Sequence, residues 1–168
     1  SAASTLTTPV ILHVSNDFNG DGKTDILWRN AVSGDVALWS MNGGTVASNK
    51  TVYAGIPTSS VISDGAGDYN GDGKADILWR NSVTGDVIMW SMNGAAIGGG
   101  GMVYAGIPTS SVINDGSGDY NGDGKSDILW RNPSGDVVVW LMNGLSIAGG
   151  GLAGNAAASW VIGDGSGD

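Results

Sequence analysis

The nonapeptide Asp17-Phe18-Asn19-Gly20-Asp21-Gly22-Lys23-Thr24-Asp25 decides the fold, because the chain writes it three times. It returns as Asp68-Tyr69-Asn70-Gly71-Asp72-Gly73-Lys74-Ala75-Asp76 and as Asp119-Tyr120-Asn121-Gly122-Asp123-Gly124-Lys125-Ser126-Asp127, with a spacing of 51 residues each time. Self-similarity at such a period indicates a repeat architecture. The rest of the chain is therefore read as copies of one unit.

The spacing inside the nonapeptide predicts a binding loop for a hard cation. Oxygen-bearing side chains stand at positions 1, 3, 5 and 9, and a glycine at position 6 permits a sharp turn. The backbone carbonyl at position 7 supplies a fifth oxygen. Calcium takes six to eight oxygens, so one bidentate Asp and a water would complete the shell, whereas magnesium prefers a rigid octahedron and fits less well.

The candidate ligands are the same five positions in each copy, and we expect about three Ca²⁺ per chain. They are Asp17, Asn19, Asp21, Lys23 and Asp25, then Asp68, Asn70, Asp72, Lys74 and Asp76, then Asp119, Asn121, Asp123, Lys125 and Asp127, each Lys acting through its backbone carbonyl.

Two other interpretations of the loop, an EF-hand and an ordinary turn, account for it less well. An EF-hand needs a Glu at position 12, but Trp28, Trp79 and Trp130 stand there and the chain contains no Glu. Asn, Asp and Gly also dominate ordinary turns. Three copies would nevertheless gather nine carboxylates into three small loops, and their mutual repulsion calls for a counter-charge.

Composition narrows the class of protein. The 168 residues carry a formal net charge of −9, and all sixteen acids are Asp. Three bound Ca²⁺ ions, with six positive charges, would bring that charge to −3. The acidic balance argues against nucleic acid as a partner, and no apolar run approaches a membrane span. Weak calcium loops need the millimolar calcium found outside cells, so we expect an extracellular protein, secreted or at the cell surface.

Short apolar runs separated by turn signals predict an all-β fold with about four antiparallel strands in each unit. In the first unit the strands are expected at Ile26–Trp28, Val36–Trp39, Thr51–Tyr53 and Val61–Ile62. Four strands repeating every forty to fifty residues are typical of β-propeller blades. The predicted division is 1–9 as an N-terminal extension, 10–67, 68–118 and 119–168 as three blades, the last including the start of a fourth.

These residues also carry a family resemblance. The recurring Gly-Asp-(Phe/Tyr)-Asn-Gly-Asp-Gly-Lys-x-Asp-Ile-Leu-Trp-Arg-Asn text resembles the FG-GAP/VCBS-type repeat over residues 10–168. The resemblance implies a calcium-binding β-propeller blade, similar to those of integrin α-subunit heads and some propeller lectins. Asn at position 3, where the family has Asp, is a departure that implies a weaker ligand.

Three blades cannot close a ring, because propellers have four to eight. The expected partners are therefore copies of the same chain, joined head to tail into a ring or filament, or further blades of a longer chain. The expected function is a non-enzymatic structural or adhesion module. The alternative is a propeller lectin that binds glycans.

Six repeated tryptophans separate these two readings: Trp28, Trp39, Trp79, Trp90, Trp130 and Trp140. Solvent-facing Trp would serve a sugar ring, whereas one large side chain per repeat suits packing between blades, which is the favoured interpretation. Arg29, Arg80 and Arg131 follow three of them and are expected either to pair with Asp35, Asp86 and Asp136 or to lay their stems over Trp. With no Cys, no Glu, His13 as the single histidine and the Asp residues largely committed to metal, we expect no catalytic residues and no enzymatic activity.

Overall fold

The computed structural model describes residues 14–163, and it is built entirely of β-strands in three antiparallel sheets. The first sheet contains β1 (Ile26–Arg29), β2 (Val36–Asn42) and β3 (Thr45–Tyr53). The second contains β4 (Ser60–Asp64), β5 (Ile77–Asn81), β6 (Val87–Asn93) and β7 (Ala96–Tyr104). The third contains β8 (Val112–Asp115), β9 (Ile128–Arg131), β10 (Asp136–Asn143) and β11 (Ser146–Asn155).

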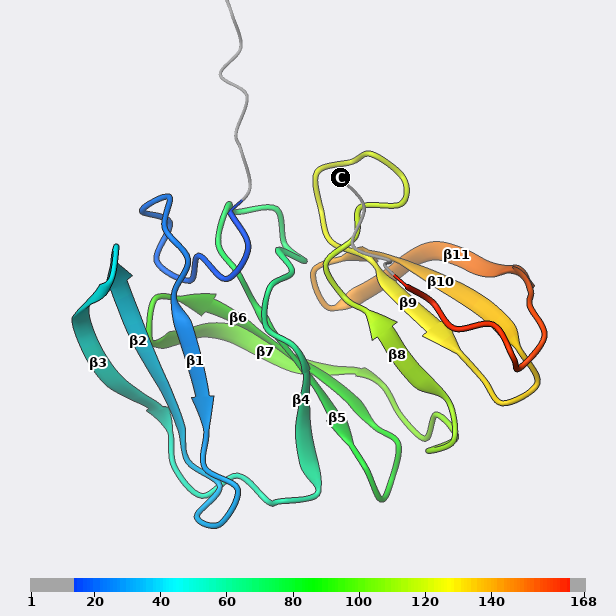
Figure 1. Cartoon of the computed structure of the whole chain (residues 1–168), viewed down its shortest axis with the longest axis horizontal. Helices are drawn as coiled ribbons and strands as arrows, with labels where there is room; N and C mark the ends of the chain where they lie inside the picture. The colour runs from blue at the N-terminus through cyan, green and yellow to red at the C-terminus, as the bar shows by residue number, and fades with distance from the viewer. Residues whose placement is uncertain (1–13, 164–168) are drawn as a thin grey trace, which may run out of the picture.

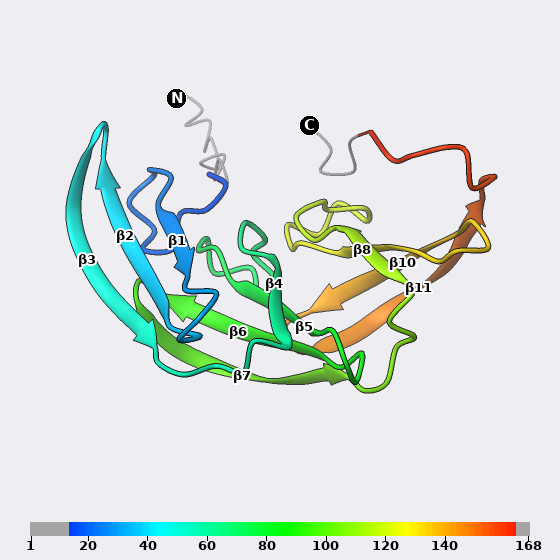
Figure 2. The ribbon, with the colours of Figure 1, turned by 60° about the horizontal axis from the view of Figure 1, so that its bottom comes forward.

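The sheets follow one another along an open arc, in the order in which the chain makes them (Figures 1 and 2). Within each sheet the strands are neighbours in sequence. The connections are short hairpins except between β4 and β5 and between β8 and β9, where the second and third nonapeptide loops lie. The all-β fold of propeller-type blades predicted from the sequence is thereby confirmed, with sheets of three to four strands that do not close into a ring. Residues 14–163 contain no helix long and apolar enough to cross a bilayer.

One strand assignment was wrong. Val61–Ile62 was expected to complete the first sheet, but β4 pairs with β5, so this segment opens the second sheet. The reason is that residues 54–59 carry the chain from the outer strand of one sheet to the inner strand of the next, across the junction. The corresponding segment before the first loop falls mostly on residues 10–13, outside the described residues, as does the expected N-terminal extension.

Glycine makes the hairpin between the first two strands of a sheet possible. Gly34 has φ +80°, and a Cβ at this position would collide with the carbonyl oxygen of Ile56. The amide of Ile56 in turn donates to the carbonyl of Gly34 over 3.1 Å. Gly85 and Gly135 stand in the same place in the later sheets, against Ile107 and Ala156. The connecting segment is thus fastened to the hairpin of the sheet that it leaves.

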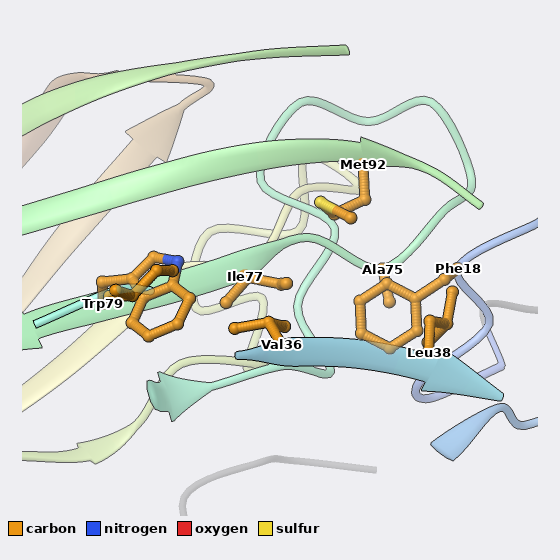
Figure 3. Packing of buried hydrophobic residues seen from close by; sticks show 8 residues of the cluster. Phe18, Val36, Leu38, Ala75, Ile77, Trp79 and Met92 are labelled. Atoms are coloured by element: carbon orange, nitrogen blue, oxygen red, sulfur yellow. The ribbon is translucent and has the colours of Figure 1, made fainter. Parts of the chain in front are cut away.

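The apolar core lies between sheets and not within them. Phe18, Val36 and Leu38 from the first repeat face Ile77 and Trp79 from the second, and all five are at most 2% exposed (Figure 3). An equivalent cluster joins the second sheet to the third, built from Tyr69, Leu78, Val87, Met89, Ile128, Trp130 and Met142. Each sheet is therefore stabilised chiefly by its neighbour, as in a repeat protein.

The burial of Tyr69 gives a test of this arrangement. Tyr69 is fully buried, whereas its equivalent Tyr120 is 41% exposed, and each hydroxyl donates to an Asp, Asp64 or Asp115. Replacing either tyrosine with alanine removes this hydrogen bond. The difference between the two losses of stability therefore reports the burial of Tyr69 at the junction between sheets. We expect Tyr69→Ala to lower the free energy of unfolding by about 3–5 kcal/mol and Tyr120→Ala by much less, measured by urea unfolding of dilute protein. Equal losses would contradict the inter-sheet core.

Candidate metal centre and the junction between sheets

The first Asp of each loop organises the turn. The carboxylate of Asp17 accepts hydrogen bonds from the backbone N–H groups of Gly20 (2.8 Å), Asp21 (3.2 Å) and Gly22 (2.7 Å). Gly20 and Gly22 have φ of +75° and +80°, which L side chains rarely adopt. A single carboxylate thus holds the tight loop, and it does so from a buried position.

The middle of the loop is a chain of Asx turns. The Asn19 amide oxygen accepts the N–H of Asp21 over 2.9 Å, and one oxygen of Asp21 accepts the N–H of Lys23 over 3.0 Å. The ammonium of Lys23 lies 3.2 Å from the other oxygen of Asp21. These residues are exposed or half-buried, so only modest stabilisation comes from that ion pair.

The last Asp ties the loop to the sheet. Asp25 is 2% exposed, and its two oxygens accept the N–H of Phe18 over 3.2 Å and the N–H of Met41, on β2, over 2.9 Å. Its side chain therefore connects the start of the loop, its end and the second strand. Sequence reasoning assigned this residue to the metal alone and missed its structural bonds.

The other two loops repeat these contacts. Asp68 and Asp119 hold their turns through bonds of 2.7–3.1 Å, Asn70 and Asn121 accept from Asp72 and Asp123, and the ammonium groups of Lys74 and Lys125 lie 3.7 and 3.8 Å from those same aspartates. Asp76 and Asp127 accept from Tyr69 and Met92 and from Tyr120 and Met142.

The buried carboxylates carry an electrostatic penalty. Desolvation raises the pKa of Asp76 to about 7, the repulsion from Asp68 and Asp72 adds to it, and the backbone bonds from Met92 and Tyr69 oppose it. The pKa values of Asp25 and Asp127 are raised for the same reasons in their own loops. The charges of each loop therefore lie close enough to disfavour the ionised state of its buried Asp.

The donor set suits a hard cation in kind, since all the candidate ligand atoms are oxygens. In the part of the chain that the structure describes, no three carboxylate or histidine side chains are gathered as a metal cluster. The carboxylates are instead turned toward backbone N–H groups. Oδ1 of Asp17, Asp68 and Asp119 already accepts two N–H groups, whereas Oδ2 of each accepts one and keeps a lone pair for a further ligand contact.

The first two loops also reach the following sheet, which the sequence alone did not reveal. The carbonyl of Asp17 accepts the N–H of Ala75 over 2.8 Å, and the carbonyl of Phe18 accepts the N–H of Gly94 over 2.6 Å. The next junction repeats both bonds at 2.8 Å, from Ser126 to Asp68 and from Gly144 to Tyr69. The loops are thus clamps between consecutive sheets.

The arginines cross the same junction, and their expected pairing with aspartates was wrong. Among residues 14–163 no ion pair joins Arg29, Arg80 or Arg131 to Asp35, Asp86 or Asp136. Asp35 and Asp86 instead accept the N–H groups of Gly55 and Gly106, over 2.9 and 3.0 Å.

The arginines bind carbonyl groups of the connecting segments instead, such as those of Ile56 and Pro57 for Arg29. Each of the first two guanidinium groups also lies over a tryptophan of the following sheet. The distance to the ring centroid is 5.4 Å for Arg29 over Trp79 and 4.8 Å for Arg80 over Trp130. Cation–π contact of this kind is strongest when it is shielded from water, as at these junctions.

The six tryptophans occupy different environments. Trp79 and Trp130 lie in the two cores, at 2% and 4% exposed, whereas Trp28 is 46% exposed and Trp39, Trp90 and Trp140 are half-buried. Within each sheet the two rings pack together, with their centroids 4.9 Å apart. The pairs are Trp28 with Trp39, Trp79 with Trp90, and Trp130 with Trp140. His13 lies outside the described residues.

Two related repeat families match the chain. An FG-GAP-like repeat family model matches residues 17–79, and an FG-GAP repeat model matches residues 61–105 and 115–161. A search of curated protein sequences and a search of solved structures found no match to the chain.

The raised pKa of Asp76 predicts how stability depends on pH without metal. In a chelating buffer the folded state binds this proton more tightly than the unfolded state. The free energy of unfolding should therefore fall as pH rises from 3.8 to about 7. The raised pKa values of Asp25, Asp64 and Asp127 act in the same direction.

Thermal unfolding between pH 4 and pH 7 measures this slope, and Asp76→Asn should reduce it because one titrating group is gone. A metal-free protein that becomes more stable as the pH rises over this interval would contradict the assignment.

Proposed function

The chain belongs to the FG-GAP repeat family, and from that premise we propose that it is a non-enzymatic, calcium-stabilised blade module of an extracellular assembly or adhesion protein. FG-GAP repeats occur in extracellular adhesion-type proteins and are generally structural modules. We assign one Ca²⁺ to each of the three loops, where the ions would stabilise the fold and take no part in catalysis.

One observation carries this proposal: the loop that offers the oxygens is the loop that clamps the next sheet. Asp17 supplies a candidate ligand through its side chain and accepts the Ala75 N–H through its carbonyl. Asp68 does the same with Ser126, whose hydroxyl also accepts the Asp68 N–H over 2.9 Å. A cation that stiffens the loop would therefore strengthen the junction between sheets.

Charge supports the same assignment. Burial makes Asp25, Asp76 and Asp127 hard to ionise, and a divalent cation is the counter-charge that would reverse this. The lysines do not fill that role, because Lys23, Lys74 and Lys125 contact the exposed position-5 aspartates. The lysines of the loops therefore leave the charge of the buried carboxylates unneutralised, and a bound cation would neutralise it.

The size of the expected effect follows from binding linkage. Extracellular calcium modules have dissociation constants of about 10⁻⁴ to 10⁻³ M, so about 2 mM calcium would stabilise each site by about 1–2 kcal/mol at the tighter end of that range. Three such sites would be a substantial part of the stability of a domain of this size.

Asp72→Ala tests the metal role in the middle loop. Asp72 is exposed, so little is lost without calcium. In about 2 mM calcium the variant should be less stable than the wild type by about 1–2 kcal/mol. Thermal unfolding with and without chelator measures both values. Val83→Ala, an exposed change in the same repeat, is the control and should leave the calcium effect intact.

Equal losses for Asp72→Ala in calcium and in chelator would reject calcium binding at this loop. Calorimetric titration adds an independent readout, because the variant should bind one ion fewer than the wild type.

Glycan binding is the second candidate, and a pocket at the first junction favours it. The pocket, of about 270 Å³, is lined by Tyr53, Ile56 and Pro57 from the first repeat and by Trp79, Ile88 and Trp90 from the second. Tyr53 is 51% exposed and its ring centroid lies 5.5 Å from that of Trp90. Aromatic faces of this kind suit the apolar face of a sugar ring.

Tryptophan fluorescence tests the glycan candidate. If sugars occupy this pocket, a panel of mono- and oligosaccharides should contain a ligand that changes the emission. Tyr53→Ala should then weaken its binding about tenfold or more, since tyrosine is enriched among the contact residues whose truncation costs about 2 kcal/mol or more. Val32→Ala, an exposed change away from the pocket, is the control. A panel without any response would leave the structural module as the function.

A further inference from the structure

The two internal junctions show which surfaces of a sheet fit together. We call the surface that a sheet turns toward the preceding sheet its leading face, represented by Ile77, Trp79 and Met92 in the second sheet. The trailing face, turned toward the following sheet, is represented by Val36 and Leu38 in the first. At both internal junctions the trailing face of one sheet packs against the leading face of the next.

Among residues 14–163, nothing covers the leading face of the first sheet. Ile26 and Trp28 are 38% and 46% exposed, whereas Ile77 and Trp79, their equivalents in the second sheet, are 0% and 2% exposed. Met41 is half-buried where Met92 is buried. The same side chains that fill the two cores therefore form an exposed apolar surface at one end of the arc.

The trailing face of the third sheet is the complementary surface. Val137 and Val139 are only half-buried, whereas Val87 and Met89, their equivalents in the second sheet, are fully buried. Tyr120, which follows the third loop's first Asp, is 41% exposed. Arg131 lies on this face. Its equivalents in the first two sheets, Arg29 and Arg80, lie over a tryptophan of the following sheet.

The charged groups of the loops match in the same sense. A Cβ at Gly20 or Gly71 would meet the side chain of the following loop's lysine, Lys74 or Lys125, at 3.5 or 3.3 Å. In the described part of the chain, nothing lies within 4 Å of a Cβ at Gly122. The Lys23 side chain is 45% exposed, whereas those of Lys74 and Lys125 are 26% exposed. One end thus presents an uncovered acidic loop, and the other presents a more exposed lysine.

We propose that a second copy of this chain docks head to tail, with the leading face of its first sheet on the trailing face of the third sheet of its neighbour. The contact reproduces the internal junctions: Arg131 covers Trp28 of the next copy, the Lys23 side chain lies over Gly122, and the Thr24 N–H donates to the carbonyl of Asp119. The proposal rests on the role of the chain as a blade module, and it does not depend on calcium.

The contact is heterologous, because two different surfaces meet. Docking one pair of faces leaves another pair available, so copies add in succession until a ring closes or a filament grows. A symmetric dimer, in which a face meets its own copy, would lack the match of Arg to Trp. The arc of three sheets in Figure 2 shows the two end faces on opposite sides of the molecule.

Variants blocked at one face test the pairing. Ile26→Asp disables the leading face and Val139→Asp disables the trailing face. Ile26 is 38% exposed and Val139 is half-buried, and neither belongs to the two buried cores, so the sheets should still form. Alone, each variant should be monomeric by analytical ultracentrifugation at concentrations where the wild type associates. Mixed in equal amounts, they should form a 1:1 dimer through the one intact pair of faces.

Further variants address individual contacts. Trp28→Ala and Arg131→Ala should each weaken self-association about 30-fold or more, as aromatic and arginine hot spots do, and the double variant should lose less than the two effects combined. Val32→Ser is the matched control: Val32 is 92% exposed, and its equivalent Val83 stays 75% exposed in a sheet covered on both faces. Circular dichroism and thermal unfolding of each variant establish that it is folded.

The outcomes separate this proposal from the calcium role. If the wild-type chain stays monomeric up to millimolar concentration, in calcium and in chelator, head-to-tail docking is rejected. The two faces would then be contact surfaces for other blades. Association by Val139→Asp alone overturns head-to-tail docking in favour of a symmetric contact. Association that persists in chelator, with no effect of calcium on thermal unfolding, supports docking while rejecting the calcium assignment.

Discussion

The junction between consecutive sheets is the interaction on which the rest of this structure depends. One repeat cannot bury its hydrophobic face alone, and here the fully buried side chains lie between sheets. Phe18 and Tyr69 illustrate this, since each belongs to a loop of one repeat and fills the space in front of the next sheet. Stability, curvature and the uncovered ends of the arc all follow from the same contact.

The loops bring buried carboxylates to that junction, where the ionised form is disfavoured. Asp25, Asp76 and Asp127 are buried because their oxygens satisfy backbone N–H groups of the loop and of the second strand of the hairpin. Burial of an unpaired group would cost more than burial of a bonded one, so the hydrogen bonds explain why an Asp is tolerated there. They do not neutralise its charge, which either a proton or a bound cation would do. The calcium role that we propose at the junction rests on this point.

The repeats are alike in sequence but not in environment, and the differences carry functional information. Trp28, Trp79 and Trp130 are equivalent positions, yet only the last two lie beneath a preceding sheet. The indole Nε1 groups of Trp79 and Trp130 are buried and have no hydrogen-bond partner among the described residues, which fits packing driven by the apolar and cation–π contact of the ring. Comparing equivalent residues therefore distinguishes the buried interior of the arc from surfaces that remain to be covered.

The sequence by itself determined the three units, their β character and the loop positions with oxygen side chains, because period, turn residues and spacing are local properties that repetition reinforces. It did not determine that β4 joins the following sheet, that Arg29 reaches Trp79, or that Asp17 and Phe18 clamp the next sheet through their carbonyls. Those contacts join residues from 14 positions apart, as between Asp64 and Leu78, to 76 positions apart, as between Phe18 and Gly94. Backbone carbonyls are present at every residue, so no pattern marks them. Only the tertiary structure, by stacking one sheet on the next, decided which groups meet and which faces stay exposed.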